Sequence, residues 1–306
     1  MLSKGVEKIC RDIKALRIQG ARNVAQSAIK AMALQARESD AESVEELKSD
    51  LLVAADELAR ARPTEPMLQN SLRFLFVEMG KYKRKDVHEL KEILAHEEKV
   101  LLNRFSANAS KIADFGAQEI PKNATILTHC HSSTVTGAIK RAYDLGKNPS
   151  VICLETRPRF QGRITAEELG RHGIETTLFV DSAVASVMRE ATMVLVGADS
   201  VLSRGDLINK IGTLAVAQVA YDSDVPFLCC AELSKFDPLT IFGRVTEIEE
   251  RDPKEVADPK KFKRVKVRNP AFDRTPAKYI SAYITEKGVV SPHAIATIAM
   301  GEFSLE

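Results

Sequence analysis

The chain has 306 residues, an apolar content of 44% and a formal net charge of +2. That length is enough for two domains with sizeable cores, and the apolar content excludes global disorder. A nearly balanced charge does not favour nucleic acid as a partner, which usually requires a basic surface. Because no apolar run reaches membrane-spanning length and no signal peptide opens the chain, we expect a cytoplasmic protein without a membrane partner.

The first 118 residues are predicted to be helical. Apolar side chains recur at helical spacing in four segments: residues 6–18, 44–58, 68–79 and 87–116. Polar residues 40–43 are suited to cap the second segment. Arg62-Pro63-Thr64 is predicted to begin a helix, with Pro63 at its first position.

After Pro121, short apolar runs of strand length alternate with helical patterns. The runs are residues 124–130, 150–155, 176–180, 193–196 and 225–231. Alternating strands and helices predict a parallel sheet with helices on both faces. The charged stretch from Glu247 to Arg268 is interpreted as a solvated excursion. The five cysteines form no Cys-x-x-Cys pair, which favours reduced thiols over a disulfide framework.

Polar residues gather where four of these predicted strands end. The clusters are residues 128–133, 155–158, 197–199 and 232–237. In open parallel sheets, ligands bind outside the carboxyl ends of the strands. This pattern therefore predicts a binding or catalytic site along one edge of the sheet.

Cys130 ends the first of these strands. Most free cysteines are buried apolar thiols, but Ser132 or Ser133 is suited to cap a following helix, whose free amides can bind phosphate. Such amides favour a thiolate and a bound phosphate opposes it, so the direction of the thiol pKa shift stays open. His129 and His131 are expected on the face opposite the thiol. With no third ligand apparent, a zinc site is not expected.

Asp199 follows the fourth strand, where a turn or capping aspartate is as well supported as a catalytic one. Gly205-Asp206 is predicted to open an amphipathic helix, which places Asn209 and Lys210 in its first turns. Backbone amides and a lysine there would together hold an anion, although a lone lysine is more often only solvated. Gln19-Gly20-Ala21-Arg22 interrupts a helical pattern with glycine, which costs ~1 kcal/mol unless the backbone must approach something.

Together these residues resemble the family that joins methylthioribose-1-phosphate isomerases, archaeal ribose-1,5-bisphosphate isomerases and the α, β and δ regulatory subunits of the exchange factor for translation initiation factor 2. The motifs that carry the resemblance are Gly20-Ala21, Arg62–Thr64, Thr128–Cys130, Glu155–Gly162, Val180–Ser182, Gly197–Asp199, Asn209–Thr213, Asn269–Asp273 and Thr275-Pro276. The resemblance covers most of the chain. It implies an α/β protein with a helical N-terminal domain, residues 1–118, and a Rossmann-like catalytic domain, residues 119–306.

Isomerases of this family carry a catalytic cysteine and aspartate, which match Cys130 and Asp199, whereas the regulatory subunits generally lack them. The stretch His129–Ser133 looks like the bisphosphate isomerases, because methylthioribose-1-phosphate isomerases typically have His-Cys-Asn-Thr-Gly there. Within Leu233–Asp237 this chain has Lys235 where those enzymes typically have threonine. Both differences would help to hold a second phosphate, unless Lys235 is a solvent-exposed lysine.

The resemblance implies conversion of α-D-ribose 1,5-bisphosphate to D-ribulose 1,5-bisphosphate in AMP degradation. A protonated Asp199 would give its proton to the ring oxygen. Cys130 would move a proton between C2 and C1, since a thiol pKa of ~8.5 lies near neutrality; a hydride shift stays open. The residues expected to hold the two phosphates are Gln19, Gly20, Ala21, Arg22, Arg62, Ser132, Ser133, Thr134, Asn209, Lys210 and Lys235. Gln161 is expected near a sugar hydroxyl, and no metal or redox cofactor is implied.

Gln19 stands where the family usually has arginine, and Arg22 is expected to replace the lost charge. Two other functions stay open: a methylthioribose-1-phosphate isomerase, and a non-catalytic protein similar to the regulatory subunits. The expected partners are a small sugar bisphosphate and further copies of the chain, in dimers or in hexamers built from dimers.

Overall fold

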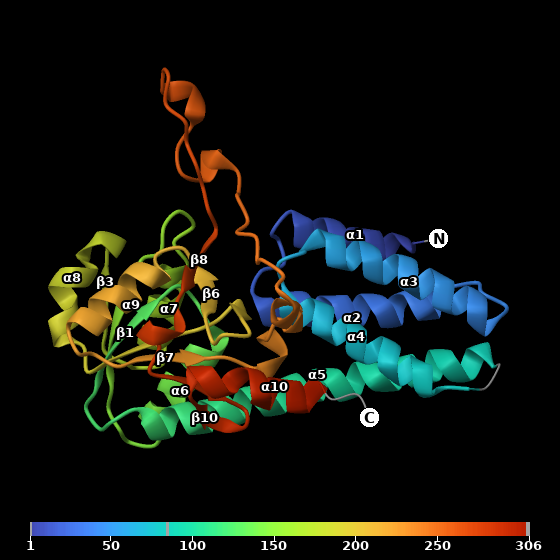
Figure 1. Ribbon diagram of the computed structural model, residues 1–306, viewed down its shortest axis with the longest axis horizontal. Helices are drawn as coiled ribbons and strands as arrows, with labels where there is room; N and C mark the ends of the chain where they lie inside the picture. Colours follow the sequence, from blue (N-terminus) through green and yellow to red (C-terminus); the bar gives the residue numbers. More distant parts are fainter. Residues whose placement is uncertain (1, 84–85, 304–306) are drawn as a thin grey trace. The chain divides into compact units, whose positions relative to one another are not determined.

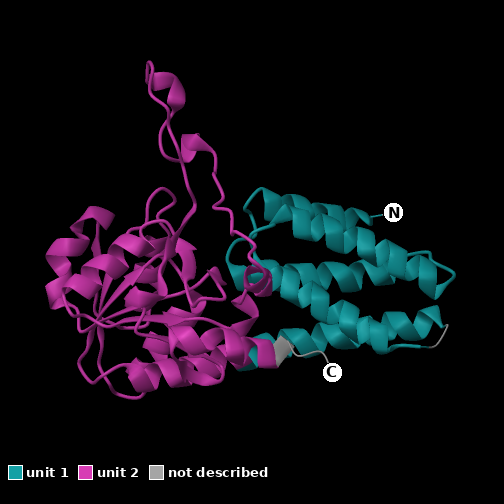
Figure 2. Ribbon diagram, viewed as in Figure 1, with its two compact units in different colours: residues 1–107, 304–306 teal, residues 108–303 magenta. Residues whose placement is uncertain are grey.

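A computed structural model describes residues 2–83 and 86–303 of the chain. These residues form two compact units (Figure 2). Unit 1 extends to Ala107, and unit 2 runs from Asn108 to Phe303.

Unit 1 is helical, with its apolar faces gathered in one core. Its helices are α1 (Lys4–Lys14), α2 (Ala21–Glu38), α3 (Val44–Ala61), α4 (Pro66–Lys81) and the first part of α5 (Val87–Glu119). As predicted, the polar residues before α3 cap it, because the Ser43 side chain accepts a hydrogen bond from the Glu46 N–H. The helix predicted to start at Pro63 begins at Pro66 instead. Arg62 is the C-terminal cap of α3, and Pro63 lies in the turn that follows.

The two units divide inside α5, whereas the sequence pattern puts the domain boundary between residues 118 and 119. Leu101 and Phe105 belong to the helical core of unit 1. Ile112 and Ala117, further along the same helix, belong to a core of unit 2. A change of sequence pattern marks where a helix ends, but not which core each of its turns joins.

Unit 2 is built on a β-sheet surrounded by helices (Figure 1). The sheet has seven strands in the order β10-β9-β7-β4-β1-β2-β3. Its strands are β1 (Thr125–His129), β2 (Ser150–Leu154), β3 (Thr176–Phe179), β4 (Met193–Val196), β7 (Phe227–Cys230), β9 (Ala282–Thr285) and β10 (Gly288–Val290). All neighbours are parallel except β9 and β10. The first five strands coincide with the five predicted apolar runs.

Helices cover both faces of this sheet, as predicted. Successive residues of β1 point to opposite sides, so Ile126 packs with α5 and α6 (Ser133–Asp144), and Leu127 joins a second core. The first core also takes a leucine from α7 (Gln161–Arg171). The second core contains residues of α8 (Val184–Val187), α9 (Thr213–Asp222) and α10 (Ile295–Phe303).

A small antiparallel sheet, β5 (Ser200–Val201), β6 (Leu207–Lys210) and β8 (Phe272–Thr275), replaces the helix predicted after Gly205. All four residues of β6 are buried, and β6 is hydrogen-bonded on both edges. β5 lies only a few residues before it, but β8 lies far away in the sequence, so four residues of local pattern could not distinguish a strand from a first helical turn. The helix α9 starts only after Gly212, whose φ of 102° suits glycine.

Short 3-10 turns complete the fold: Asp181–Ala183, Met188–Glu190, Leu233–Lys235, Pro238–Phe242, Pro253–Glu255, Pro259–Lys261, Ala277–Tyr279 and Pro292–Ala294. Most of the stretch from Glu247 to Arg268 is exposed, as its charge predicts. Arg251 is the exception, because its side chain is only 8% exposed. In the described part of the chain, no helix is long and apolar enough to cross a membrane.

Two glycines of α7 give a matched test of its close packing on β2. A Cβ on Gly162 would overlap the carbonyl oxygen of Leu154, whereas a Cβ on Gly170 would meet nothing within 4 Å. We expect Gly162→Ala to lose at least ~3 kcal/mol of unfolding free energy, because backbone cannot yield to the added methyl. Gly170→Ala should gain ~0.5–1 kcal/mol through helix propensity. Urea unfolding measures both, and equal stabilities would contradict the packing.

Candidate active site

The order of the large sheet reverses beside its central strand. From β1 the chain adds β2 and then β3 on one side, and then crosses to β4 on the other. Ligands of such sheets bind at this switch point, outside the carboxyl ends of the two strands. Cys130 directly follows β1 and Asp199 follows β4, so the two candidate catalytic residues flank the switch point.

The chain leaves β1 through an unusual backbone conformation. Cys130 has a φ of 71°, in the left-handed region that costs a non-glycine residue ~1–2 kcal/mol. Its N–H donates to Thr156 Oγ1 at 2.8 Å, and its carbonyl accepts from Thr165 Oγ1 at 2.9 Å. The conformation interrupts strand alternation, so His129 and His131 do not form the shared face predicted for them. His129 bonds the Ile211 carbonyl, whereas His131 bonds Thr165.

Burial raises the pKa of the Cys130 thiol from 9.0 to about 11, with nearby Lys210 opposing and Asp199 adding to the shift. The residue still keeps partial solvent contact. Burial of the thiol and partial exposure of the residue as a whole therefore occur together. The direction that the sequence left open is therefore upward, and a pKa of about 11 leaves the thiol protonated at pH 7 in the free protein.

Lys210, at the end of β6, is buried beside the same thiol. Burial lowers its pKa, against the opposing effects of Cys130 and Asp199. Its Nζ lies 4.9 Å from the centre of the Phe272 ring. Asn209 is also buried and donates to Thr213 Oγ1 at 3.1 Å. Thus Asn209 and Lys210 lie on a strand, and not in the helical turn predicted for them.

Asp273 of β8 fixes the turn between Lys210 and α9. Its carboxylate accepts from the Gly212 N–H at 2.7 Å and from the Leu214 N–H at 3.2 Å. Burial raises the Asp273 pKa to about 6, although these two N–H groups and Lys210 oppose the rise. Asp273 thereby places a carboxylate at the start of a helix, where the helix dipole favours negative charge.

Lys235 lies in the turn that follows β7, and only 8% of it is exposed, so the solvent-exposed alternative is wrong. Its Nζ donates to the carbonyl oxygen of Ala198 at 2.6 Å. Ala198 immediately precedes Asp199, so this bond ties the end of β7 to the loop that carries the candidate acid. An ammonium group has two further N–H bonds to offer.

Ser132, Ser133 and Thr134 form the start of α6. Ser132 is the N-terminal cap by position, and its hydroxyl bonds Thr134 Oγ1 at 2.8 Å instead of the helix backbone. Ser133 is exposed and Thr134 is buried. A Cβ on Gly197 would lie 2.5 Å from Ser132 Oγ, so the end of β4 closely approaches this helix start.

The remaining phosphate candidates belong to unit 1. Gln19, Gly20, Ala21 and Arg22 form the start of α2, where Gly20 is the cap with a φ of 82°. Gln19 donates to the Leu16 carbonyl at 2.7 Å. Gly20 therefore precedes a helix and does not interrupt one. Arg62 is only 6% exposed and lies 3.7 Å from the Glu65 carboxylate.

Several residues around Cys130 were not singled out from the sequence. The backbone N–H groups of Thr156 and Arg157 donate to the Asp181 carboxylate at 2.7 and 2.6 Å. Arg251 packs over the Phe272 ring at 5.6 Å and lowers the Cys130 pKa. Thr156, Asp181 and Asp273 lie within the motifs that carry the family resemblance, but the sequence alone assigns them no role. Arg251 has no such signal, because it is one charge in a charged stretch.

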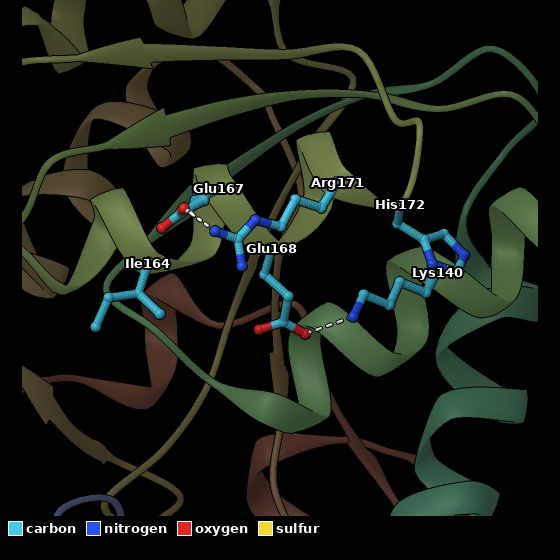
Figure 3. Close-up of a pocket in the computed structure, with 6 residues that line it drawn as sticks. All are labelled: Lys140, Ile164, Glu167, Glu168, Arg171 and His172. Atoms are coloured by element: carbon cyan, nitrogen blue, oxygen red, sulfur yellow. Dashed lines mark hydrogen bonds and ion pairs between the residues drawn. The ribbon is translucent and has the colours of Figure 1, made fainter.

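A cavity of about 350 Å³ is lined by side chains of α6 and of α7 with its C-terminal cap (Figure 3). It is lined by Lys140, Ile164, Glu167, Glu168, Arg171 and His172. Its acids are paired with bases: Lys140 bonds Glu168 at 2.6 Å, and Arg171 bonds Glu167. Glu168 lies 3.9 Å from His131 Nδ1. The cavity thus lies between helices and away from the strand ends. Among the described residues, no group of three His, Cys, Asp or Glu side chains could hold a metal ion.

The architecture and the site define a Rossmann-like α/β protein with candidate acid–base residues at its switch point. Residues 17–292 match the model of the Initiation factor 2 subunit family, and the chain belongs to that family. It is 42% identical to the ribose 1,5-bisphosphate isomerase of Methanocaldococcus jannaschii over 94% of this chain and 92% of that one. It is 37% identical to the methylthioribose-1-phosphate isomerase of Heliobacterium modesticaldum, over 96% and 90%.

Solved structures of the same family share the fold. The translation initiation factor eIF-2B of Pyrococcus horikoshii OT3 superimposes with a TM-score of 0.82 at 32% identity, covering 95% of this chain and 98% of that one. The family resemblance and the predicted fold class are therefore confirmed.

The reactivity of Cys130 should reflect its raised pKa. In a Cys10→Ser background, which removes the other partly exposed cysteine, alkylation by iodoacetamide should rise about tenfold per pH unit from 7.5 to 9.5. A raised thiol pKa moves the appearance of thiolate to higher pH, so the rate should not level off at pH 9. Peptide mass spectrometry locates the label. A plateau at or below pH 9 would show that the thiol is not shielded in this way.

Proposed function

We propose that the chain is a ribose-1,5-bisphosphate isomerase that forms D-ribulose 1,5-bisphosphate. The observation that carries this proposal is the meeting of Cys130, Asp199 and the buried Lys210 at the switch point of the sheet. A thiol and a carboxylate supply the two proton-transfer groups of an aldose–ketose isomerisation. A buried cation beside them suits an anionic substrate. The identity to enzymes of that name over nearly the whole chain supports the same function.

The 1-phosphate on the anomeric carbon prevents the sugar ring from opening as in a free sugar. A proton must reach the ring oxygen while its bond to C1 breaks, and we assign that step to Asp199. The C2 proton must then leave and a proton must arrive at C1, which we assign to Cys130 through an enediol. Transfer of hydride from C2 to C1 would give the same product.

The thiol pKa of about 11 indicates the protonation state of Cys130 before the reaction. Free protein holds the proton on sulfur, where it cannot act as a base. Cys130 must therefore lose this proton before it can take the proton from C2. Lys210 assists because its charge lowers the thiol pKa.

The second phosphate is assigned to Lys235 and to the start of α6. Burial of a lysine charge costs free energy, and Lys235 is only 8% exposed beside the loop of Asp199. A bound anion would offset that cost. The start of α6 offers backbone N–H groups beside Ser132, Ser133 and Thr134. A 5-methylthio group would instead need apolar surroundings, so this pocket favours the bisphosphate over methylthioribose 1-phosphate.

Within unit 2, the first phosphate is assigned to Asn209 and Lys210. The phosphate roles of Gln19, Gly20, Ala21, Arg22 and Arg62 in unit 1 remain predictions from the family resemblance. Gln161 begins α7, and its buried Oε1 has no hydrogen-bond partner among the described residues, which suits it to accept from a sugar hydroxyl. We further propose a role in AMP degradation, in the cytoplasm, and assembly of the chain into dimers or into hexamers built from dimers. These three points rest on the family resemblance.

A non-catalytic role is the second candidate, supported by the 32% identity to a protein named as translation initiation factor eIF-2B. The purified protein should therefore be offered ribose 1,5-bisphosphate and methylthioribose 1-phosphate side by side, with the ketose product measured. We expect turnover of the bisphosphate, and a loss of at least about 10³-fold in kcat for Cys130→Ser and for Asp199→Asn.

Both variants keep the size of the side chain, so their folding and substrate binding should stay near those of the parent. Calorimetry with ribose 1,5-bisphosphate checks the binding. Retained turnover in either variant would refute its assigned role. A parent that converts neither sugar phosphate but binds an initiation-factor subunit would favour the regulatory function.

Substitution of Lys235 should affect the two candidate substrates to different extents. Removal of a lysine that pairs with phosphate in a partly desolvated site costs ~2–5 kcal/mol, or at least about 30-fold in affinity. We therefore expect Lys235→Thr to lose at least that factor in kcat/KM on ribose 1,5-bisphosphate. Activity on methylthioribose 1-phosphate, which has no 5-phosphate, should change much less.

Lys235→Met serves as a second variant, because it approximately keeps the length of the side chain and removes the ammonium group, with its charge and its hydrogen bond to the Ala198 carbonyl. It should behave like Lys235→Thr on the bisphosphate if the ammonium binds phosphate. If both variants match the parent on that substrate, the preference for the bisphosphate loses its main support.

A further inference from the structure

Cys130 reaches the candidate site only because its backbone is left-handed. Non-glycine residues rarely adopt a φ of 71°, and such conformations persist where the surroundings hold them. The residue carries a side chain that the proposed chemistry uses. Any group that holds this backbone conformation therefore also determines where the thiol lies.

Two threonine hydroxyls hold both backbone polar groups of Cys130. The N–H of Cys130 donates to Thr156 Oγ1 at 2.8 Å, and the carbonyl of Cys130 accepts from Thr165 Oγ1 at 2.9 Å. Thr156 follows β2 and is 0% exposed, whereas Thr165 lies on α7 and is 1% exposed. The two bonds come from different elements and so restrain the residue from two sides.

Each threonine is itself fixed in place. Thr156 Oγ1 donates to the Leu154 carbonyl at 3.1 Å, and its backbone N–H donates to Asp181 at 2.7 Å. A hydroxyl has one proton, and Thr165 gives it to Cys130, so the 3.1 Å contact with His131 requires His131 Nδ1 to be the donor. The surrounding network thus leaves neither hydroxyl free to turn away.

We propose that Thr156 and Thr165 are positioning residues that clamp Cys130 in the left-handed conformation and thereby direct its thiol towards Asp199 and Lys210. The catalytic consequence rests on the function proposed above. The position of the thiol does not, because chemical labelling reports it without any substrate. A merely structural role of the hydroxyls would support the fold without controlling the thiol.

The test compares Thr156→Val and Thr165→Val, each in the Cys10→Ser background. Valine keeps the shape of threonine and removes the hydroxyl. Thr156→Ser and Thr165→Ser keep the hydroxyl. Thr285→Val is the matched control elsewhere: Thr285 is 0% exposed and donates to the Gly288 carbonyl at 2.9 Å, the same length as the bond to Cys130.

We expect both valine variants to raise the alkylation rate of Cys130 at pH 8 at least fivefold, because a released thiol moves towards solvent and its pKa falls towards 9. Their kcat on ribose 1,5-bisphosphate should fall at least tenfold while KM changes less than threefold. Both serine variants and Thr285→Val should stay within twofold of the Cys10→Ser parent in labelling rate. Cys153, Cys229 and Cys230 are buried and should remain unlabelled, which shows that the fold is intact.

Valine variants that fold but keep the parent's labelling rate and kcat would overturn the clamp. If the parent converts no sugar phosphate and the valine variants still expose the thiol, the clamp stands and the proposed function falls. If a valine variant does not fold, it is repeated with Cys130→Gly, since glycine adopts this conformation without strain. Recovery of a cooperative thermal transition supports the clamp, and failure to recover overturns it.

Discussion

The parallel pairing of β1 with β4 is the constraint on which the candidate site depends. It aligns Ile126 with Met193 and Leu127 with Val194, so the two strands run side by side towards the same edge. Without this pairing, residues 130 and 199 would be nearly seventy positions apart with nothing to join them. The crossover that places β4 beside β1, and not beside β3, also opens the switch point where a ligand can enter.

Burial has opposite consequences for the two groups that meet at this point. A low-dielectric environment disfavours charge, so it raises the pKa of Cys130 and lowers that of Lys210. A bound dianion would favour the charged lysine and oppose the thiolate. Binding of such a ligand would therefore favour the charged form of Lys210 and oppose the charged form of Cys130.

The sequence predicted the five strands that are continuous apolar runs and the strand ends at which Cys130, Asp199 and Lys235 lie. It failed for β6, because the strand that pairs with all four residues of Leu207–Lys210 is β8, more than sixty residues later, while the nearby β5 pairs with only two of them. It also failed for Thr156, whose role exists only through the 2.8 Å bond to Cys130. Local patterns report burial and periodicity. They do not report which distant backbone group a hydroxyl will meet.

The fold by itself does not decide the function, because the same architecture occurs in a protein named as an initiation factor and in enzymes named as isomerases. A catalytic function is favoured by a set of residues whose backbone conformation or burial costs folding free energy. A left-handed cysteine, a buried Lys210 and a buried Lys235 each cost stability unless they are compensated. An apolar residue at these positions would serve the fold better than a lysine does. Their concentration at one strand edge is therefore better explained by chemistry on an anionic ligand than by packing.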